Sequence, residues 1–569
     1  MYVIARKSVL VSLLATFSLL LWAEGGAAPA PAPAGAKRDA VSVRLPSAAF
    51  AAMETIDPEH IRWHVRYLSH DLLEGRGTGQ RGGDIAAEYM ATQFAEYGLK
   101  PAGDNGSYLQ KVPLVGITTL PETRFSLVPK QGGAMHLKAL DEYVAYDQTQ
   151  QPESDVDAEI VYVGYGIEAP EYDWDDYKGT DVRGKVLLML VNEPPSDDPK
   201  FFKGKALTYY GRWTYKYEEA ARKGALGVIL IHREDMASYP WEVVRNSNSG
   251  EKSYLKLDGP ALKVASWVQL DVAKKLAAAS GMDLEKMMAD ARTREFRPVN
   301  LGAKLKVHMV SKVRNFESNN VLAMLPGSNR KSKDEAVMYT AHYDHLGFRP
   351  DMPGDNIYNG AADNATGCGI LLELARSFSV AKQNPGRSII FAAVTAEEQG
   401  LLGSEYLGKH PPIPAGKIAL DLNYDDVQPI GAPEEVEVSG AERTTFYPWV
   451  QATAKEFRLA IRPDARPEAG HFYRSDHFSL ARVGIPSFSI NEGMKYKGHD
   501  EAWGIARDKE YVQNRYHQPS DEYRPEMNFV GDAAMARFGF ALGWEAASFS
   551  KLLGWQKGDE FESARIKSQ

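Results

Sequence analysis

From Asn319 onward, short apolar runs alternate with longer segments whose apolar residues recur at helical spacing. Helices are expected over 368–379 and 401–410, with a final one near 531–548. Strands that alternate with helices of this length predict an α/β fold with a mostly parallel central sheet and helices on both faces. The expected strands are NVLAMLPG, AVMYTAHYD, SIIFAAV, KIALDLN and GIPSFSI.

Between about residues 155 and 298 the pattern changes to short strands and aromatic-rich loops. EIVYVGYGI, GKVLLMLVN and ALGVILIH are predicted strands, and YKYEEAARKG is a predicted helical stretch that stops at Gly224. We interpret this region as a second, β-rich α/β domain inserted into the first. The expected division is an N-terminal part of the main domain over 46–130, the insertion over 131–310, the rest of the main domain over 311–550 and a charged tail over 551–569.

The N-terminus has the layout of a secretory signal peptide. Arg6 and Lys7 precede an apolar stretch from Val9 to Trp22, and small residues follow it. This stretch is too short to span a bilayer comfortably, although an uncleaved anchor is the alternative. We expect a signal peptide over 1–27, an Ala/Pro-rich linker over 28–45, and a protein that is periplasmic or secreted.

Composition narrows the possible functions. At 569 residues the chain exceeds what one hydrophobic core usually serves, which favours two domains. A net charge of −9 without a long basic cluster argues against nucleic acid as a partner, and the mature protein is not expected to bind membranes. The single cysteine, Cys368, excludes an intrachain disulfide and is expected as a small buried thiol.

Candidate metal-binding residues collect at the ends of predicted strands. Glu397 and Glu398 follow an apolar run that ends at Val394, where further apolar residues would be expected. Functional residues gather at the carboxyl ends of strands in such sheets, and zinc accepts histidine nitrogen and carboxylate oxygen. One bridging carboxylate, with a histidine and another carboxylate for each metal, would hold two ions about 3.5–4 Å apart. The other candidates are His342, Asp344, Asp363, Asp425 and His517.

Other interpretations of single motifs remain open. The two glutamates could merely cap the helix expected to begin near Leu401. HExxH, GxSxG and phosphate-loop motifs are absent, so the enzyme classes that depend on them have no support. The segment from Gly77 to Gly82 has the spacing of a dinucleotide-binding loop, but the preceding DLLEGR is a poor strand, so a flexible surface turn is expected.

Several motifs together resemble one known family. HYDHLG, GAADNATG, TAEEQG, NYDDV, SDHFSLARVGIPSF and YHQPSDEY resemble, in this order, the motifs of the co-catalytic zinc exopeptidases, which include bacterial leucyl aminopeptidases, aminopeptidase Y and glutamate carboxypeptidase. The resemblance covers roughly 319–548 and the earlier segment LSHDLLEGRGTGQRGGDIAAEYM. The inserted region is similar to a protease-associated domain.

The resemblance implies a role for each matched residue. His342 and Asp425 would bind one zinc ion, Glu398 and His517 a second, and Asp363 would bridge them. The remaining matches are Glu397 as general base, Asp344 as the carboxylate that orients His342 through its other ring nitrogen, and Tyr516 as a hydrogen-bond donor to the developing oxyanion.

The match has one departure and a few rival residues. The family commonly has an aspartate where this chain has Ala362, but the bridging position itself is intact. Asp426 is a rival for Asp425, which aligns better behind Asn423. Structural roles are expected for the remaining motif histidines, His345 and His477.

The resemblance implies a secreted aminopeptidase that uses two zinc ions to remove N-terminal residues from peptides. A glutamate-type carboxypeptidase and a glutaminyl cyclase-like enzyme with one zinc are alternatives on the same fold, as is a non-catalytic receptor. Oxygen and imidazole ligands also accept cobalt and manganese, so the ligand types alone do not select zinc.

Overall fold

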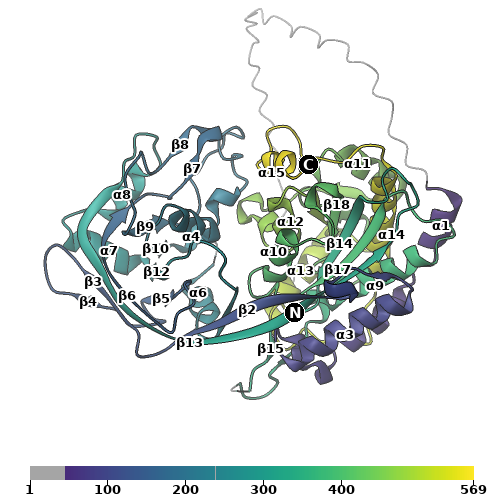
Figure 1. The fold of residues 1–569 in the computed structure, drawn as a ribbon, viewed down its shortest axis with the longest axis horizontal. Helices are drawn as coiled ribbons and strands as arrows, with labels where there is room; N and C mark the ends of the chain where they lie inside the picture. Colours follow the sequence, from purple (N-terminus) through teal and green to yellow (C-terminus); the bar gives the residue numbers. More distant parts are fainter. Residues whose placement is uncertain (1–44, 238, 351) are drawn as a thin grey trace, which may run out of the picture. The chain divides into compact units, whose positions relative to one another are not determined.

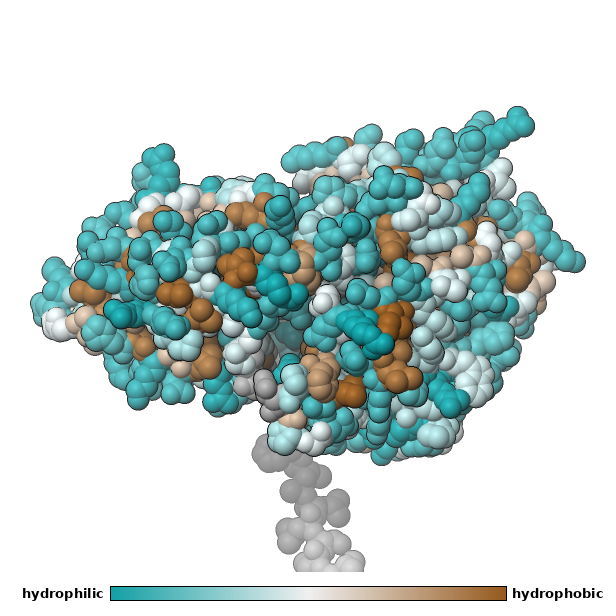
Figure 2. Space-filling model, turned by 60° about the horizontal axis from the view of Figure 1, so that its bottom comes forward, coloured by the Kyte–Doolittle hydropathy of each residue, from teal (hydrophilic) through white to brown (hydrophobic). Residues whose placement is uncertain are grey.

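The computed structural model describes residues 45–237, 239–350 and 352–569. The predicted signal peptide and all but the last residue of the predicted linker lie outside these residues. Among the described helices, none combines the length and the apolar character that crossing a membrane requires. On the face shown in Figure 2, hydrophobic side chains are scattered among hydrophilic ones.

The larger group of elements is built on a five-stranded stretch of sheet. Its order is β21 (Ser487–Ser489), β18 (Ile418–Asn423), β14 (Ala336–His342), β17 (Ser388–Val394) and β13 (Val299–Leu325). The first four strands are parallel to their neighbours, whereas β13 pairs with β17 in the antiparallel sense. All five runs predicted as strands are therefore strands, and the sheet is mostly parallel.

Helices cover both faces of this sheet, as predicted (Figure 1). On one face, α2 (Pro58–Leu68) and α14 (Val530–Ser548) pack against α9 (Gly367–Ser379). On the other face, α10 (Leu402–Lys409) packs against α12 (His477–Arg482). Three of these helices coincide with the predicted ones to within one or two residues.

Strand alternation explains how one sheet supports both layers. In β14, Val337 and Tyr339 are buried under the α9 layer, while Ala336 and Met338 are buried under the α10 layer. Neighbouring residues of a strand point to opposite faces, so a strand buried on both sides must be apolar throughout. This is why the central strands appear in the sequence as continuous apolar runs.

The smaller group of elements has its own sheet and its own core. The order is β6 (Glu153–Tyr162), β9 (Val186–Leu190), β10 (Gly227–His232), β12 (Val264–Gln269) and β5 (Tyr143–Tyr146), with only β5 antiparallel to its neighbour. The three strands predicted in this region are present. Its helices include α4 (Trp213–Arg222), α7 (Leu270–Ala279) and α8 (Leu284–Asp290).

Two long strands run through both groups of elements (Figure 1). β2 (Leu109–Thr119) pairs with the second half of β13 in a continuous antiparallel register, from Ser311↔Thr119 to Val321↔Leu109. The first half of β13 pairs with β6 and with β3 (Arg124–Val128). The smaller sheet therefore includes residues before 131, and residue 310, the expected end of the insertion, lies inside one uninterrupted strand.

The expected charged tail is partly folded. It contains α15 (Glu562–Ser568), and Trp555 and Phe561 are buried in a small aromatic cluster.

The other helices and strands are α1 (Ser47–Met53), α3 (Arg81–Glu96), α5 (Glu234–Ala237), α6 (Trp241–Ser247), α11 (Tyr447–Glu456), α13 (Glu501–Asn514), β1 (Lys100–Pro101), β4 (Met135–His136), β7 (Glu168–Ala169), β8 (Trp174–Asp175), β11 (Lys252–Leu255), β15 (Gly347–Phe348), β16 (Ile357–Tyr358), β19 (Glu435–Glu437), β20 (Ala460–Arg462) and β22 (Asn491–Glu492).

Candidate metal centre

Acidic and histidine side chains lie at the ends of three neighbouring strands, at one edge of the larger sheet. β14 ends at His342, β17 ends just before Glu397 and Glu398, and β18 ends just before Asp425. These strands are parallel neighbours, so their carboxyl ends lie at the same edge. The sequence interpretation of one shared site therefore agrees with the topology.

The first cluster surrounds His342. Its Nε2 lies 3.0 Å from Oδ1 of Asp425 and 3.3 Å from Oδ1 of Asp363. The three residues offer one ligand atom each, all within 4.8 Å of one another. Asp363 belongs to the helical turn η5 (Ala361–Thr366), which leads into α9. The rival carboxylate of Asp426 instead lies 3.3 Å from the Tyr511 hydroxyl group, which donates a hydrogen bond to it.

The second cluster surrounds Glu398. Nε2 of His517 lies 3.1 Å from Oε2 of Glu398 and 3.1 Å from Oδ2 of Asp363. His345 approaches from the other side, with its Nδ1 2.6 Å from Oε1 of Glu398. His345, Asp363 and Glu398 also offer ligand atoms within 4.8 Å of one another. The sequence favoured a structural role for His345 over metal ligation. Its place three residues after His342, in the same strand-end loop, was the signal that could have included it.

Asp363 lies between the two clusters, because one of its oxygens faces His342 and the other faces His517. Its side chain is 4% exposed and that of Glu398 is 3% exposed, so little water can solvate these charges. In the described part of the chain, the only charged groups of opposite sign within ion-pair distance of these carboxylates are the histidines. Buried carboxylates require pairing or metal coordination, so the donor set fits bound divalent cations.

Glu397 has different surroundings from Glu398. Its carboxylate is 4.0 Å from Nε2 of His342, and its side chain is 13% exposed. Among the described residues, no hydrogen-bond donor to this carboxylate is found. The Glu397 backbone is engaged: its N–H donates to Oδ1 of Asp344 at 3.1 Å, and its oxygen accepts hydrogen bonds from the N–H groups of Gly400 and Leu401. The two adjacent glutamates therefore point to different places, as neighbouring residues on extended backbone do.

The structure assigns Asp344 a contact that differs from the expected one. Nδ1 of His342 is 3.1 Å from the backbone oxygen of Asp344 and 3.8 Å from its carboxylate. The carboxylate instead accepts hydrogen bonds from the Glu397 backbone and, at 2.9 Å, from the Thr78 hydroxyl. His342 is thus oriented by the main chain of this loop, while the Asp344 side chain braces the turn that carries Glu397.

The pKa values of the two glutamates are shifted in opposite directions. Burial raises the pKa of Glu397 well above its usual range, and the nearby Asp425 and Glu398 charges add to this effect. Burial would also raise the pKa of Glu398, but the His517 and His345 charges outweigh it and lower the value to about 2. Burial would lower the pKa of His517, yet Glu398 and Asp363 raise it well above its usual range. The negative charge at this strand edge thus attracts cations.

Tyr516 lies beside the second cluster. Its ring stacks on the His517 ring with centroids 4.0 Å apart, and the residue is 39% exposed. The Tyr516 side chain is therefore partly exposed beside the second cluster.

Two residues that contact the clusters were missed in the sequence. The Ser475 hydroxyl donates to Oδ2 of Asp425 at 2.5 Å. Asp521 accepts hydrogen bonds from the backbone N–H groups of Ala362 and Asp363 at 3.1 Å. Both lie within quoted motifs, SDHF and HQPSDEY, but nothing in the spacing of those motifs distinguishes a supporting residue from a surface one.

The glycine-rich segment expected as a flexible surface turn does form a turn, with Gln80 and Arg81 exposed, but its start is packed against the site. Arg76 is fully buried, and Gly77 forms an isolated bridge with His345. The Arg76 guanidinium donates to the backbone oxygens of Tyr343 (2.7 Å), Asn359 (2.6 Å) and Gly360 (2.8 Å), and also to that of Leu68. This packing was not predictable, because the contacts that order this segment come from residues far away in sequence.

Replacing Arg76 by Met is expected to weaken both folding and metal binding. The change leaves buried carbonyl groups without donors, at roughly 1–3 kcal/mol for each unsatisfied group before relaxation. Because Tyr343 and Gly360 belong to the loops that carry the clusters, zinc affinity should also fall by about tenfold or more, as with other supporting residues of metal sites. Urea unfolding and zinc titration would measure the two effects. Wild-type values in both would contradict this role.

Comparison with known proteins gives a consistent result. The model of "Peptidase family M28" matches residues 320–536, which include every predicted metal ligand. A "Probable zinc metalloprotease" of Pyrenophora tritici-repentis is 42% identical over 114 residues, covering 19% of this chain and 22% of the relative. "Aminopeptidase YwaD" of Bacillus subtilis is 29% identical over 210 residues, covering 36% of this chain and 40% of the relative. The chain thus spans less than half the length of these curated relatives.

The fold also has a counterpart among solved structures. "Aminopeptidase from Aneurinibacillus sp. strain AM-1" superposes with a TM-score of 0.50 at 19% identity, covering 89% of this chain and 97% of the other. At this identity the likeness concerns the fold alone. The comparisons thus show that residues 320–536 are similar to peptidase family M28 and that the fold resembles that of a solved aminopeptidase.

Proposed function

We propose that this chain is a metal-dependent aminopeptidase that uses two zinc ions to hydrolyse peptides at their N-terminus. The observation that carries the proposal is the position of Asp363, whose two oxygens face His342 at 3.3 Å and His517 at 3.1 Å. A carboxylate shared by two histidine-containing clusters is the arrangement a two-metal site needs.

The proposed ligand sets follow the two clusters. His342, Asp425 and Asp363 would hold one ion, and His517, Glu398 and Asp363 the other. His345, fully buried beside Glu398, would support that carboxylate from behind. When bound, divalent cations act as Lewis acids that lower the pKa of bound water and polarise the substrate carbonyl.

In this proposal, side chains of the protein transfer the proton and stabilise the developing oxyanion. Glu397 accepts the proton of the attacking water at its carboxylate and then returns it to the departing amine. No described residue donates a hydrogen bond to that carboxylate, so it is free for this task. Tyr516, which is 39% exposed, donates a hydrogen bond to the oxyanion that develops on the substrate.

A glutamate-type carboxypeptidase or a glutaminyl cyclase-like enzyme would use similar motifs. A single-metal cyclase has no need for a carboxylate between two clusters, so the Asp363 geometry favours the peptidase. A non-catalytic receptor would not need a buried, unengaged Glu397. Export through the N-terminal segment, and a protease-associated nature of the smaller sheet, are parts of the same proposal.

The test is a panel of substrates assayed with and without a chelator. We expect release of N-terminal residues from aminoacyl arylamides and free peptides, no reaction with N-terminally blocked peptides, and loss of activity after chelation that zinc restores. Cleavage of the blocked peptides at their C-terminus would favour the carboxypeptidase. Metal analysis that finds one ion per chain would favour the cyclase.

A further inference from the structure

The Ser475 loop, residues 470–476, leads into α12 and carries a side chain that contacts the first cluster. Ser475 donates a hydrogen bond to Oδ2 of Asp425 at 2.5 Å and accepts one from the side-chain amide of Asn423 at 2.8 Å. Since Asn423 is the last residue of β18, the hydroxyl group is held on two sides. Groups that bind a metal ligand from behind orient it and tune its affinity for the metal. The direction of the Asp425 carboxylate therefore depends on where this loop places Ser475.

Two adjacent carboxylates of the C-terminal segment, residues 551–569, contact this loop and its surroundings. Oε1 of Glu560 accepts a hydrogen bond at 2.6 Å from the hydroxyl group of Tyr473, which lies two residues before the serine. The same oxygen accepts a second hydrogen bond, also at 2.6 Å, from Nη2 of Arg443. The Asp559 carboxylate accepts two further bonds from the Arg443 guanidinium, at 2.8 Å and 2.9 Å. One arginine thus binds both carboxylates of the segment, and one of these carboxylates binds the loop.

These charged groups are largely shielded from water. The exposed fraction of the side chain is 4% for Asp559, 13% for Glu560 and 11% for Arg443. Although burial alone would raise the pKa of Asp559, the neighbouring Arg443 charge lowers it. Lys203, from the smaller group of elements, adds a second cation at 3.4 Å from Oε1 of Glu560. Hydrogen bonds between charged groups are the strong ones, so this network holds the segment in a defined position.

Aromatic side chains join the same two parts of the chain. The central guanidinium carbon of Arg443 lies 4.4 Å from the centroid of the Phe472 ring and 4.7 Å from that of the Phe561 ring, within cation–π distance. The two rings stack with their centroids 5.9 Å apart. Phe472 belongs to the Ser475 loop and Phe561 to the C-terminal segment, so polar and apolar contacts support one another at this junction.

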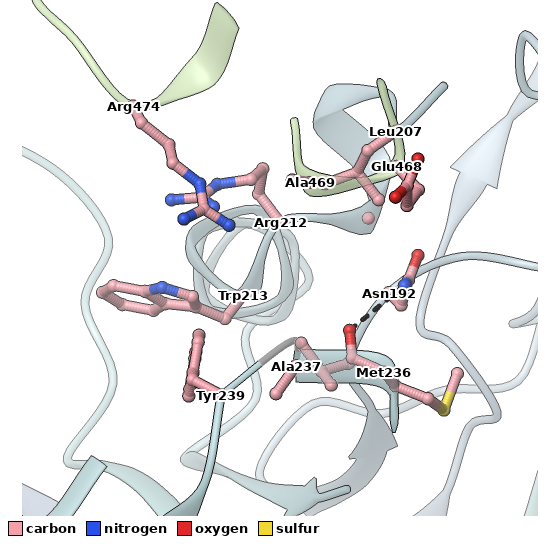
Figure 3. Close-up of a pocket in the computed structure, with 12 residues that line it drawn as sticks. Asn192, Leu207, Arg212, Trp213, Met236, Ala237, Tyr239, Glu468, Ala469 and Arg474 are labelled. Carbon is pink, nitrogen blue, oxygen red and sulfur yellow. Dashed lines mark hydrogen bonds between the residues drawn. The ribbon is translucent and has the colours of Figure 1, made fainter. Parts of the chain in front are cut away.

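The side chains around Tyr473 have few polar contacts. In the described part of the chain, Tyr473 is the only residue of 470–474 whose side chain forms a hydrogen bond. Arg474, the next residue, lines a small cavity of about 30 Å³ together with Arg212 (Figure 3). Groups at a cavity lack neighbouring atoms on one side and are less restrained by packing. The position of the loop therefore depends on its contacts with the C-terminal segment.

We propose that Asp559 and Glu560 are positioning residues for the candidate metal centre. Asp559 fixes the Arg443 guanidinium, and Glu560 binds both this group and the Tyr473 hydroxyl. The loop held in this way keeps the Ser475 hydroxyl on the ligand carboxylate of the first cluster. The inference rests on the proposed two-zinc function and adds to it a dependence of one metal position on the C-terminal segment. Loss of this contact should weaken binding of the ion in the first cluster and leave the ion in the second cluster unaffected.

The test measures zinc binding to the metal-free full-length protein by calorimetric titration. The Tyr473→Phe variant removes only the hydroxyl group that donates to Glu560. We expect one of its two ions to bind about tenfold or more weakly, as with other supporting residues of metal sites, while the other keeps its affinity. Glu560→Ala should have the same effect. A merely structural role would weaken both ions alike, and that result, or unchanged binding of both ions, would overturn the inference.

Further variants assign the effect to the bond between Tyr473 and Glu560. The double variant should bind zinc no more weakly than Glu560→Ala alone, because both changes remove the same bond, and additive losses would contradict the inference. Glu560→Gln keeps an acceptor for the tyrosine and should lie closer to the wild type than Glu560→Ala. Glu562→Ala is the matched control. Glu562 accepts a hydrogen bond from the Gly558 backbone within the segment itself, so its loss should leave both affinities unchanged.

Thermal melting of each metal-free variant checks that it is folded. If Glu560→Ala does not fold, Tyr473→Phe decides the matter, because it removes a single hydroxyl group and keeps the ring. Failure of the wild-type protein to bind two zinc ions would contradict the proposed function instead.

Discussion

The Glu397→Gln variant is expected to lose turnover while it keeps its metal. General-base catalysis contributes about 10²–10⁴-fold, so kcat should fall by that factor. The Glu397 carboxylate has no hydrogen-bond donor among the described residues and lies 4.0 Å from Nε2 of His342, so the amide should fit without disturbing either cluster. Steady-state kinetics on an aminoacyl arylamide, with zinc content measured on the same sample, would check both parts.

Glu398→Gln is the matched control, because it makes the same chemical change one residue further on. Glu398 lies within 3.1 Å of His517 and within 2.6 Å of His345, so its loss should lower zinc content as well as activity. Comparison of the two variants therefore distinguishes Glu397 as a general base from Glu398 as a metal ligand. Near-normal turnover of Glu397→Gln, or loss of zinc from it equal to that of Glu398→Gln, would contradict the assignment.

The Asp363→Asn variant is expected to lose both zinc ions and nearly all activity. Among the described residues, only Asp363 lies within ion-pair distance of both His342, at 3.3 Å, and His517, at 3.1 Å. Bound ligand stabilises a folded protein by about 4 kcal/mol when its concentration is 1,000 times the dissociation constant. Excess zinc should therefore raise the melting temperature of the wild-type protein strongly and that of the variant little.

Asp426→Asn serves as the comparison for this experiment. Asp426 is also acidic and lies near the site, but it accepts a hydrogen bond from Tyr511 and has no histidine within ion-pair distance in the described part of the chain. It should retain two zinc ions and the zinc-dependent rise in melting temperature. If Asp363→Asn bound two ions per chain, as measured by elemental analysis, the bridging role would be refuted.

Much of the fold could be predicted because its signals are local. Continuous apolar runs such as SIIFAAV and AVMYTAHYD can be satisfied only as strands buried on both faces, and the apolar spacing of 368–379 requires a helix. The pairing direction of β13 was not predictable in this way. A strand has the same side-chain pattern whichever way its neighbour runs, and the antiparallel partner is more than sixty residues away in sequence.

At the candidate metal site, too, some features could be predicted from local sequence and others depended on tertiary contacts. By itself the sequence predicted the candidate side chains, since His342, Asp363, Glu397, Glu398, Asp425 and His517 occupy strand ends and motifs typical of a metal site. Their roles as ligands and base stay a proposal. Tertiary structure alone decided what supports them: His345 beside Glu398, the Asp344 carboxylate on the Glu397 turn, and Arg76 beneath both loops. Ligand types follow from local sequence, whereas supporting contacts depend on which distant segments the folded chain brings together.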